Sequence, residues 1–423
     1  MTLTGGDRVM DQQKASDVTV LQIIPRLNSG GAERTTLEIA QALKQVGANA
    51  VIVSEGGRLV DEIRATGAIF IALPVASKNP FRIIGNIWKI GKIIRDHGVT
   101  LVHARSRAPA ISALFAARQA QLPFVTTYHS TYSLPRRQPF RALKNFYSSI
   151  MARGDRVIAN SRFIGDLIAA RHPAGAKKVR VIYRGLDGAY FNPDRFSAND
   201  IARLRSDWGV DTRDRVVLFP SRISPTKGQL VVIDAVACLS TADRENLKVV
   251  FPGPELGTPD YVALLRQRVH DLGLDDIVRF VPECREMPLA YLAADVAIGG
   301  SLVRPEAFGR TAIEAQGMGC PVIANQEGGP AETVLDAAKE GGDAFTGWLI
   351  PPQDSAALAS SLSSALSLTL ADRQTLRLRA RKHILAHFNA DQMRTDTLAV
   401  YDELLGSELA VLFQQKAVHQ EQN

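Results

Sequence analysis

Two glutamates in this sequence have the type and spacing to bind a charged, hydroxylated molecule. Glu306 and Glu314 are separated by seven residues, and a run of helix formers begins near Gly309 between them. The free N–H groups and partial positive charge at the start of such a helix can bind a diphosphate. A carboxylate on either side can accept hydrogen bonds from sugar hydroxyls. Because glutamates are also common on solvated surface helices, the surrounding residues must decide between the two interpretations.

A pair of cations precedes a second expected helix. Arg222 and Lys227 are five residues apart in a loop that follows the expected strand Val216–Phe219 and ends at Gly228. Arginine offers a planar fork of donors and lysine a compact point charge, which together suit a departing diphosphate. Chance surface charge is the alternative, and the order of strand, loop, cations and helix favours a binding role over it.

These side chains need elements to hold them, and the chain alternates short apolar runs with helical patterns throughout. Such alternation predicts parallel sheets covered on both faces, whose ligands gather where the strands end. In the first half the expected strands are Val18–Ile24, Ala50–Val53, Ile69–Leu73, Thr100–His103, Phe124–Tyr128, Arg156–Ala159 and Val179–Tyr183. In the second half they are Val216–Phe219, Lys248–Phe251, Ile277–Val281, Val296–Gly299 and Pro321–Ala324.

Several residues with possible functions lie at the strand ends of the first half. Gly30 and Gly31 come between the first strand and a helix expected from Thr35, where they can expose the helix start to an anion or simply form a tight turn. His129 follows another strand, although a lone histidine is more often structural than functional. The segment 103–107 ends a third strand, and its two arginines could meet an anionic acceptor or water.

The composition is that of a soluble globular protein. The chain has 423 residues, of which 46% are hydrophobic and 22% charged, and it contains no apolar run of about eighteen residues. The first 17 residues lack the apolar centre of a signal peptide, and the three cysteines show no metal spacing, so we expect a cytoplasmic protein. A net charge of +7 and a pI of about 9.4 allow a nucleotide, an anionic lipid or nucleic acid as partner.

The segment Arg304–Thr333 resembles the Glu-x7-Glu signature of the family 4 retaining glycosyltransferases, which have the GT-B fold. The matching residues, in order, are Pro305, Glu306, Phe308, Gly309, Glu314, Ala315, Gly319, Pro321, Val322 and Ala324. The resemblance implies that Glu306 holds hydroxyls of the donor sugar and that Glu314 holds the nucleotide ribose. It also implies that backbone amides around Phe308, Gly309 and Arg310 hold the diphosphate.

Other segments carry the same resemblance, which covers roughly residues 18 to 405. The loop with Gly30 and Gly31 resembles the family's first loop, which lies over the diphosphate and the acceptor. Arg222 and Lys227 resemble the pair that neutralises the leaving nucleoside diphosphate. The family also places a histidine after the strand that His129 follows, near C6 of the donor sugar, which favours a functional role for His129.

The implied fold class is α/β, with two doubly wound, Rossmann-like domains facing a central cleft. We expect a disordered lead (1–16), an acceptor-binding domain (17–190), a nucleotide-sugar-binding domain (200–385), a helix crossing back to the first domain (386–410) and a flexible tail (411–423). Basic and aromatic residues in the stretches 81–95 and 132–147 suit an anionic membrane surface, or are the solvated faces of ordinary helices.

The implied reaction moves a sugar from a nucleoside diphosphate to an acceptor hydroxyl, with retention of the anomeric configuration. Its expected catalytic residues are Arg222, Lys227, Glu306 and His129. No Asp-x-Asp motif occurs, so we expect neither a metal nor a cofactor beyond the donor substrate. The expected acceptor is a glycan or glycolipid of bacterial envelope polysaccharide or lipopolysaccharide synthesis, reached by peripheral contact at the inner face of the cytoplasmic membrane, and nucleic acid is not an expected partner. Two alternatives stay open: a GT-B sugar-nucleotide epimerase, and a non-enzymatic basic adaptor for membranes or nucleic acid.

Overall fold

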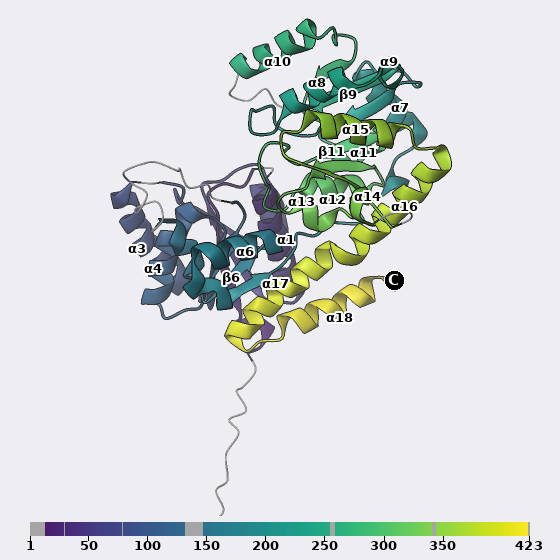
Figure 1. Ribbon diagram of the computed structural model, residues 1–423. Coiled ribbons are helices and arrows are strands. Elements are labelled where there is room, and N and C mark those ends of the chain that lie inside the picture. The colour runs from purple at the N-terminus through teal and green to yellow at the C-terminus, as the bar shows by residue number, and fades with distance from the viewer. Residues whose placement is uncertain are drawn as a thin grey trace, which may run out of the picture. The chain divides into compact units, whose positions relative to one another are not determined.

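The protein is described by a computed structural model, which covers residues 13–28, 30–77, 79–131, 147–253, 259–340 and 344–421 (Figure 1). The chain divides into two compact units, each with its own parallel sheet. The first unit comprises the chain up to residue 160, residues 164–183 and the chain from 391. The second comprises residues 161–163 and 184–390.

A seven-stranded parallel sheet in the order β3-β2-β1-β4-β5-β6-β7 forms the centre of the first unit. The order reverses at β1, which pairs with β2 on one side and β4 on the other. The central strands are buried on both faces, which explains their runs of β-branched residues. The strands are β1 (Thr19–Ile23), β2 (Asn49–Ser54), β3 (Ile69–Ala72), β4 (Leu101–Ala104), β5 (Phe124–Tyr128), β6 (Arg156–Ala159) and β7 (Val179–Val181).

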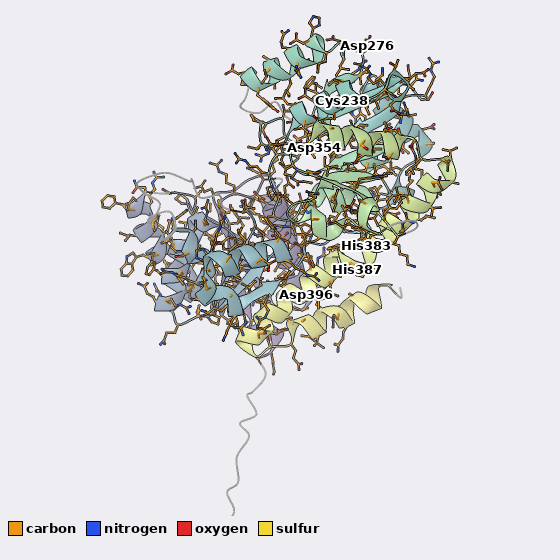
Figure 2. All side chains as sticks on the ribbon, viewed as in Figure 1. Cys238, Asp276, Asp354, His383, His387 and Asp396 are labelled. Atoms are coloured by element: carbon orange, nitrogen blue, oxygen red, sulfur yellow. The ribbon has the colours of Figure 1, made fainter. Side chains whose placement is uncertain are left out.

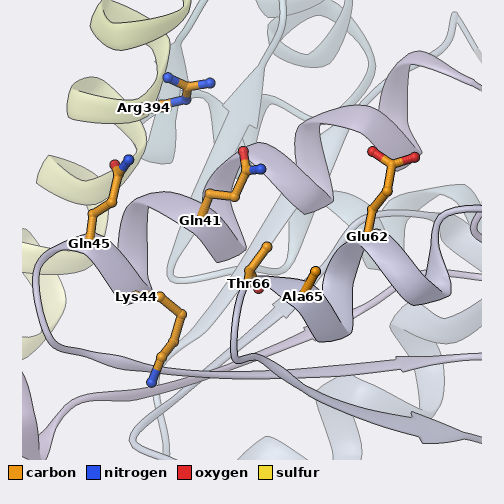
Figure 3. Close-up of a pocket in the computed structure, with 7 residues that line it drawn as sticks. All are labelled: Gln41, Lys44, Gln45, Glu62, Ala65, Thr66 and Arg394. Carbon is orange, nitrogen blue, oxygen red and sulfur yellow. The ribbon is translucent and has the colours of Figure 1, made fainter.

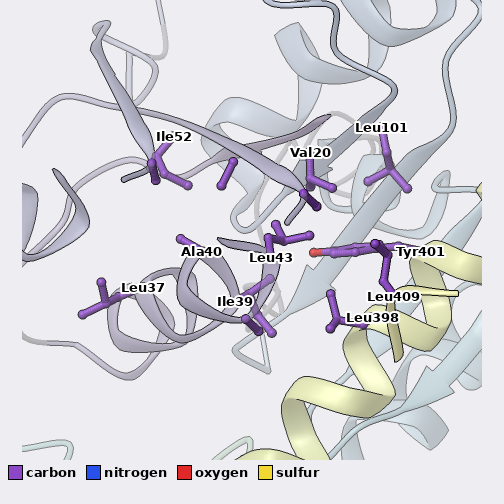
Figure 4. Packing of buried hydrophobic residues seen from close by; sticks show 14 of the residues in the cluster. Val20, Leu37, Ile39, Ala40, Leu43, Ile52, Leu101, Leu398, Tyr401 and Leu409 are labelled. Carbon is purple, nitrogen blue, oxygen red and sulfur yellow. The ribbon is translucent and has the colours of Figure 1, made fainter. Parts of the chain in front are cut away.

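Helices from both ends of the chain pack together in the core of this unit. Ile39 and Leu43 of α1 share one buried cluster with Leu398 and Tyr401 of α17 and with Leu409 of α18 (Figure 4). The C-terminal helices are therefore part of the first unit's core. The helices are α1 (Gly31–Gln45), α2 (Val60–Ala65), α3 (Pro80–Asp96), α4 (Arg107–Gln119), α6 (Arg162–Arg171), α17 (Ala390–Leu405) and α18 (Leu409–Glu421).

The second unit repeats this plan with a six-stranded parallel sheet in the order β10-β9-β8-β11-β12-β13. Its order reverses at β8, which pairs with β9 and β11. The strands are β8 (Arg215–Leu218), β9 (Leu247–Pro252), β10 (Val278–Val281), β11 (Val296–Gly299), β12 (Val322–Asn325) and β13 (Gly347–Ile350). The prediction of two doubly wound α/β domains is confirmed.

Helices α8 and α15 pack over the second sheet through the buried residues Val232, Val236, Leu358 and Leu362. The Asp354 carboxylate begins α15 by accepting a hydrogen bond from the Ala357 N–H (2.8 Å; Figure 2). The helices are α7 (Ala198–Asp207), α8 (Gln229–Cys238), α9 (Thr241–Arg244), α10 (Pro259–Asp271), α11 (Met287–Leu292), α12 (Arg310–Gly317), α13 (Pro330–Thr333), α14 (Ala337–Glu340), α15 (Ser355–Leu366) and α16 (Leu370–His387).

The division between the units lies earlier than the expected boundary at residues 190–200. Residues from Arg184 onward belong to the second unit. The reason is a short backbone pairing, in which the Leu186 N–H donates to the Phe388 carbonyl (2.7 Å) and the Ala390 N–H donates to the Leu186 carbonyl (3.0 Å). The chain returns to the first unit at Asp391, within α17.

The two ends of the chain also differ from the sequence-based expectations. The tail expected to be flexible from residue 411 is helical to Glu421, because Leu409 is fully buried and Phe413 is 3% exposed. Of the lead expected to be disordered, residues 1–12 lie outside the described residues. Its last part is ordered: a 3-10 turn spans Ala15–Asp17, and Gln13 pairs with Ser407.

Candidate active site

Two loops of the second unit leave neighbouring strands at the point where the strand order reverses. One follows β8 and runs from Phe219 to Gly228, and the other follows β11 and runs from Gly300 to Gly309. Since β8 and β11 pair in the sheet, the two loops begin side by side. Doubly wound sheets bind their ligands at such a reversal, beyond the carboxyl ends of the strands. We call these the cation loop and the carboxylate loop.

The two loops are joined by an ion pair between Lys227 and Glu306. Each of these side chains is 22% exposed, so the pair is shielded but still reachable from solvent. Gly228 follows the lysine with a φ of 100°, a backbone conformation that favours glycine. Arg222 lies on the exposed side of the cation loop. The structure therefore brings Lys227 and Glu306 together and leaves Arg222 open to an incoming anion.

The Ser301 hydroxyl, in the carboxylate loop, ties the two loops together. It donates to the carbonyl of Thr226 in the cation loop (2.7 Å). It also accepts hydrogen bonds from the backbone N–H groups of Val303 (3.2 Å) and Arg304 (3.1 Å). Because Ser301 is only 5% exposed, water has little access to replace these bonds. The position of Lys227, next to Thr226, thus depends on a buried serine.

Gln229 holds the cation loop from inside. This residue is fully buried, and its amide nitrogen donates to the Ser221 hydroxyl (3.1 Å) and to the Arg222 carbonyl (3.0 Å). The Leu302 N–H adds a bond to the Lys227 carbonyl (2.9 Å). Both ends of the loop are therefore fixed by hydrogen bonds to its own backbone, which keeps the two cations at a defined separation.

A glycine turn supports the carboxylate loop from behind. The Gly329 N–H donates to the Glu306 carbonyl (2.9 Å), and a Cβ on Gly329 would lie 2.2 Å from the Phe308 Cα. Gly309 has a φ of 83°, and a Cβ there would lie 2.6 Å from the ring of Pro330. These close approaches require glycine, and they place the start of α12 directly against the turn. Phe308 is 3% exposed and acts as a packing residue.

Glu314, one turn into α12, is held by two donors. Arg310 Nε donates to one carboxylate oxygen (3.2 Å), and the Tyr291 hydroxyl donates to the other (3.1 Å). Burial, reinforced by the negative charge of Glu314, raises the pKa of Tyr291 well above its usual value, so the phenol remains a donor. The Glu314 side chain is 14% exposed, which leaves it able to accept further hydrogen bonds.

Three of these positioning residues are not among the predicted site residues. Tyr291 lies in an apolar helical run and resembles an ordinary core aromatic residue. Gln229 opens a helix, and its burial follows only from the fold of the loop before it. Ser301 carries the one usable signal, because a polar residue directly after a buried strand and two glycines marks a strand end at the site.

The first unit holds the remaining predicted residues. Gly30 precedes α1 as its N-cap, and no side-chain cap of α1 is found among the described residues. The Arg34 N–H donates to the Gly30 carbonyl (3.0 Å), and Gly31 is the first residue of the helix. His129 follows β5 directly and is half-buried. Each of the three therefore lies at a strand end or a helix start of the first sheet.

The segment 103–107 is structural for the most part. His103 is fully buried, with its ring nitrogens 2.7 Å from the hydroxyls of Tyr401 and Thr127. Arg105 is 2% exposed and donates through Nε to the Gln22 side chain (2.6 Å), so the expectation that it meets water is wrong. Arg107 Nη1 donates to a serine hydroxyl (3.1 Å) and its guanidinium lies over an aromatic ring.

A pocket in the first unit lies between α1, α2 and α17 (Figure 3). Its lining consists of Gln41, Lys44, Gln45, Glu62, Ala65, Thr66 and Arg394. Two of its charges are already neutralised, since Glu62 pairs with Arg34 (2.8 Å) and Arg394 pairs with Asp391 (2.7 Å). The pocket contains none of the predicted site residues and lies away from the strand ends.

The described residues contain no group of three or more histidines, cysteines and acidic residues arranged to hold a metal ion. Within the same residues, no helix is both long and apolar enough to span a bilayer.

Comparison with known proteins places both units in one group. Residues 29–189 match Glycosyltransferase Family 4, and residues 200–383 match Glycosyl transferases group 1. A D-inositol 3-phosphate glycosyltransferase of Salinispora arenicola is 35% identical over 61% of this chain and 57% of its own length, less than two thirds of that relative. The protein of the same name from Jonesia denitrificans is 31% identical over 71% of each chain. The crystal structure of a glycosyltransferase from Rickettsia africae has a TM-score of 0.81 and 31% identity, covering 92% of this chain and 99% of that one.

Proposed function

Because the chain belongs to the group 1 glycosyltransferases of family 4, we propose that it moves a sugar from a nucleoside diphosphate to an acceptor hydroxyl with retention of configuration. The observation that carries the proposal is the pairing of a cation loop with a carboxylate loop where the second sheet reverses its strand order. A nucleoside diphosphate sugar has an anion and two sets of hydroxyls, which call for these two kinds of side chain.

The cation loop stabilises the leaving group. When the bond between the sugar and the phosphate breaks, negative charge builds up on the departing diphosphate, and a fixed cation beside it lowers the barrier. Lys227 is held at this place by its loop, while Arg222 is exposed and can reach over the ligand. The start of α12, where no side-chain cap occurs among the described residues, adds backbone N–H donors.

The carboxylate loop and α12 bind the hydroxyls of the donor. Glu306 pairs with Lys227 in the structure, so a donor sugar takes over part of the hydrogen bonding of that carboxylate while the diphosphate takes over part of the ammonium's. Glu314 accepts the ribose hydroxyls, with Tyr291 and Arg310 fixing its orientation. Gly30, Gly31 and His129 of the first unit contribute further contacts to the diphosphate and the sugar.

Catalysis does not require a metal ion in this proposal. Two cations and the helix start provide the positive charge that a divalent ion would otherwise supply. The donor substrate is the only nucleotide involved, so the enzyme needs no separate cofactor.

The acceptor that we propose is a glycan or glycolipid of bacterial envelope polysaccharide or lipopolysaccharide synthesis, met at the inner face of the cytoplasmic membrane. The basic side chains predicted to contact anionic lipid there are Arg136, Arg137, Arg141 and Lys144, which lie outside the described residues. The names of the two relatives favour a second acceptor class, a soluble phosphorylated cyclitol. Incubation with one acceptor of each class and analysis of the products by mass spectrometry separates the two.

A panel of UDP-, GDP- and ADP-sugars tests the proposal through their effect on the melting temperature. A ligand that binds the native protein raises its stability, so at least one sugar nucleotide should raise the melting temperature. Sugar transfer should then require an acceptor. A change of the sugar's stereochemistry without acceptor would indicate the epimerase, whereas nucleic-acid binding with a steep salt dependence and no effect of sugar nucleotides would indicate the adaptor.

A further inference from the structure

One face of α3 exposes large apolar side chains to solvent. Phe81 is 84% exposed, Trp88 71% and Ile84 54%. Their spacing of three and four residues places them on the same side of the helix. Phe115, which is 51% exposed, comes from α4, the helix packed beside α3 (Figure 1). We call Phe81, Ile84 and Trp88 the α3 face.

The exposure of this face is not the result of a poorly packed helix. The other side of α3 carries Ile90, Ile93 and Ile94, all of them buried. The Ser112 hydroxyl of α4 donates to the Ile83 carbonyl (3.0 Å), which fastens the first turns of α3 to its neighbour. The helix therefore has one apolar side that serves the fold and a second one that the described part of the fold does not cover.

The charges on α3 indicate what covers the α3 face. Arg82, Lys89, Lys92 and Arg95 are all exposed, and the helix has a single acidic residue, Asp96, which pairs with Lys92. Even in that pair the lysine side chain is 70% exposed. An apolar strip with Trp and Phe, accompanied by several cations, is the pattern of helices that lie in the interface of anionic bilayers.

A second copy of the chain fits this surface poorly. A twofold contact through the α3 face would place the same basic helix against itself, so the four cations would face four others. An anionic surface neutralises them instead. A bilayer also accepts Phe81 and Trp88 without a matching pocket, because aromatic side chains insert among the lipid head groups.

We infer that the α3 face docks the enzyme on an anionic phospholipid bilayer, with Phe81, Ile84 and Trp88 entering the interface and the basic side chains contacting lipid phosphates. The inference rests on the proposed function only in so far as such docking would present a lipid-linked acceptor to the enzyme. The contact itself needs neither donor nor acceptor, so it can be measured separately.

Vesicles of phosphatidylglycerol and phosphatidylcholine, compared with vesicles of phosphatidylcholine alone, test the inference by co-sedimentation and tryptophan fluorescence. Wild type should bind only the anionic vesicles, and binding should weaken as salt increases. Trp88 should shift its emission to shorter wavelength on binding, since Trp208 is already buried and Trp348 is half-buried. Absence of binding to anionic vesicles would overturn the inference.

Two double variants locate the contact. Phe81→Ser with Trp88→Ser should lower vesicle binding at least tenfold. Arg82→Gln with Lys89→Gln should lower it about twentyfold or more, since each basic residue near an anionic surface strengthens binding about fivefold.

Matched controls come from the second unit. Leu370→Ser with Leu378→Ser removes side chains that are 88% and 62% exposed, and Arg213→Gln with Lys382→Gln removes two exposed charges. Both control variants should bind vesicles as wild type does. Equal binding by the α3 variants and wild type would refute the docking role of α3.

Two further measurements separate the other occupants and the other failure. Loss of vesicle binding when the four basic residues between 136 and 144 are neutralised, with no loss in the α3 variants, would assign the contact to that stretch and overturn the inference. Sedimentation velocity in which wild type dimerises and Phe81→Ser with Trp88→Ser does not would assign the face to a second copy. The effect of soluble sugar nucleotides on the melting temperature should be the same in all variants, so a failure of the proposed function is recognised independently.

Discussion

Replacing Ser301 by alanine should uncouple the cation loop from the carboxylate loop. The change removes one donated hydrogen bond of 2.7 Å and two accepted ones of 3.2 and 3.1 Å. A buried hydrogen bond contributes about 0.5–1.5 kcal/mol, so the three together should contribute about 2–3 kcal/mol to the stability of the second unit. The melting temperature should then fall by about 5–10 °C.

The effect of Ser301→Ala on catalysis should exceed its effect on donor binding. Thr226 precedes Lys227, so a freed Thr226 carbonyl lets the ammonium move away from the leaving group, and a misplacement of about 1 Å can cost a hundredfold in rate. We expect kcat to fall about a hundredfold and KM for the donor to change by less than fivefold, because the charge on the diphosphate is fully developed only during bond breaking.

Two controls make this result interpretable. Ser364→Ala removes an exposed helical hydroxyl that bonds only within its own helix (3.0 Å), and it should change neither stability nor kcat. Ser301→Thr keeps a hydroxyl at the site and should recover part of the lost rate. If Ser301→Ala lowers the melting temperature but leaves kcat near that of wild type, the serine stabilises the fold without positioning Lys227, and the reasoning is refuted.

Three further predictions concern the cation, the metal and the histidines. Lys227→Ala should lower turnover by about a hundredfold or more, measured as nucleoside diphosphate release, whereas the exposed Lys382→Ala should not; near-normal turnover in Lys227→Ala would exclude the leaving-group role. Turnover should persist after exhaustive chelation, and a loss that magnesium or manganese restores would contradict the metal-independent proposal. Burial, with Arg105 adding to it, holds the pKa of His103 well below its usual value near 6.5, and burial together with the neighbouring imidazole on α16 lowers that of His383 (Figure 2). Since the unfolded chain takes up these protons below about pH 6.5 and the folded chain does not, stability is full above that pH and is lost as the pH falls through the lowered values; a calorimetric melting temperature that stays level from pH 7.5 to 5.5 would contradict this.

Much of the sheet topology could be predicted because buried parallel strands leave a clear record in the sequence. The strands Phe124–Tyr128, Arg156–Ala159 and Val296–Gly299 have the predicted bounds, since apolar runs bounded by polar or glycine residues define both of their ends. Strand β13 (Gly347–Ile350) was not predicted. It is short, begins with glycine and lies at the edge of the sheet with two of its residues half-buried, so its pattern is weak.

The order of the C-terminal tail could not be predicted from its composition. The residues from Gln414 onward are mostly polar, which favours a frayed end. Leu409 and Phe413 nevertheless pack into the core of the first unit, and this tertiary contact extends the helix beyond what local preference indicates.

The candidate site divides in the same way. The types and order of Lys227, Glu306 and Glu314 could be read from the chain, because each occupies a defined place relative to a strand or a helix start. The hydrogen bonds of Ser301 and Tyr291 could not, since they connect residues whose closeness depends on the pairing of β8 with β11 and on the packing of α11 against α12.

Direct titration of the donor tests the central claim, that the two loops of the second unit bind a nucleoside diphosphate sugar. Calorimetric titrations of UDP-, GDP- and ADP-sugars should be made in the presence of chelator on wild type, Lys227→Ala and Lys382→Ala. At least one sugar nucleotide should bind wild type and Lys382→Ala equally well, and Lys227→Ala should bind it at least tenfold more weakly, because a hydrogen bond to a charged group contributes about 1.5–3 kcal/mol. Equal affinity in Lys227→Ala, or no binding of any of the three by wild type, would contradict the account.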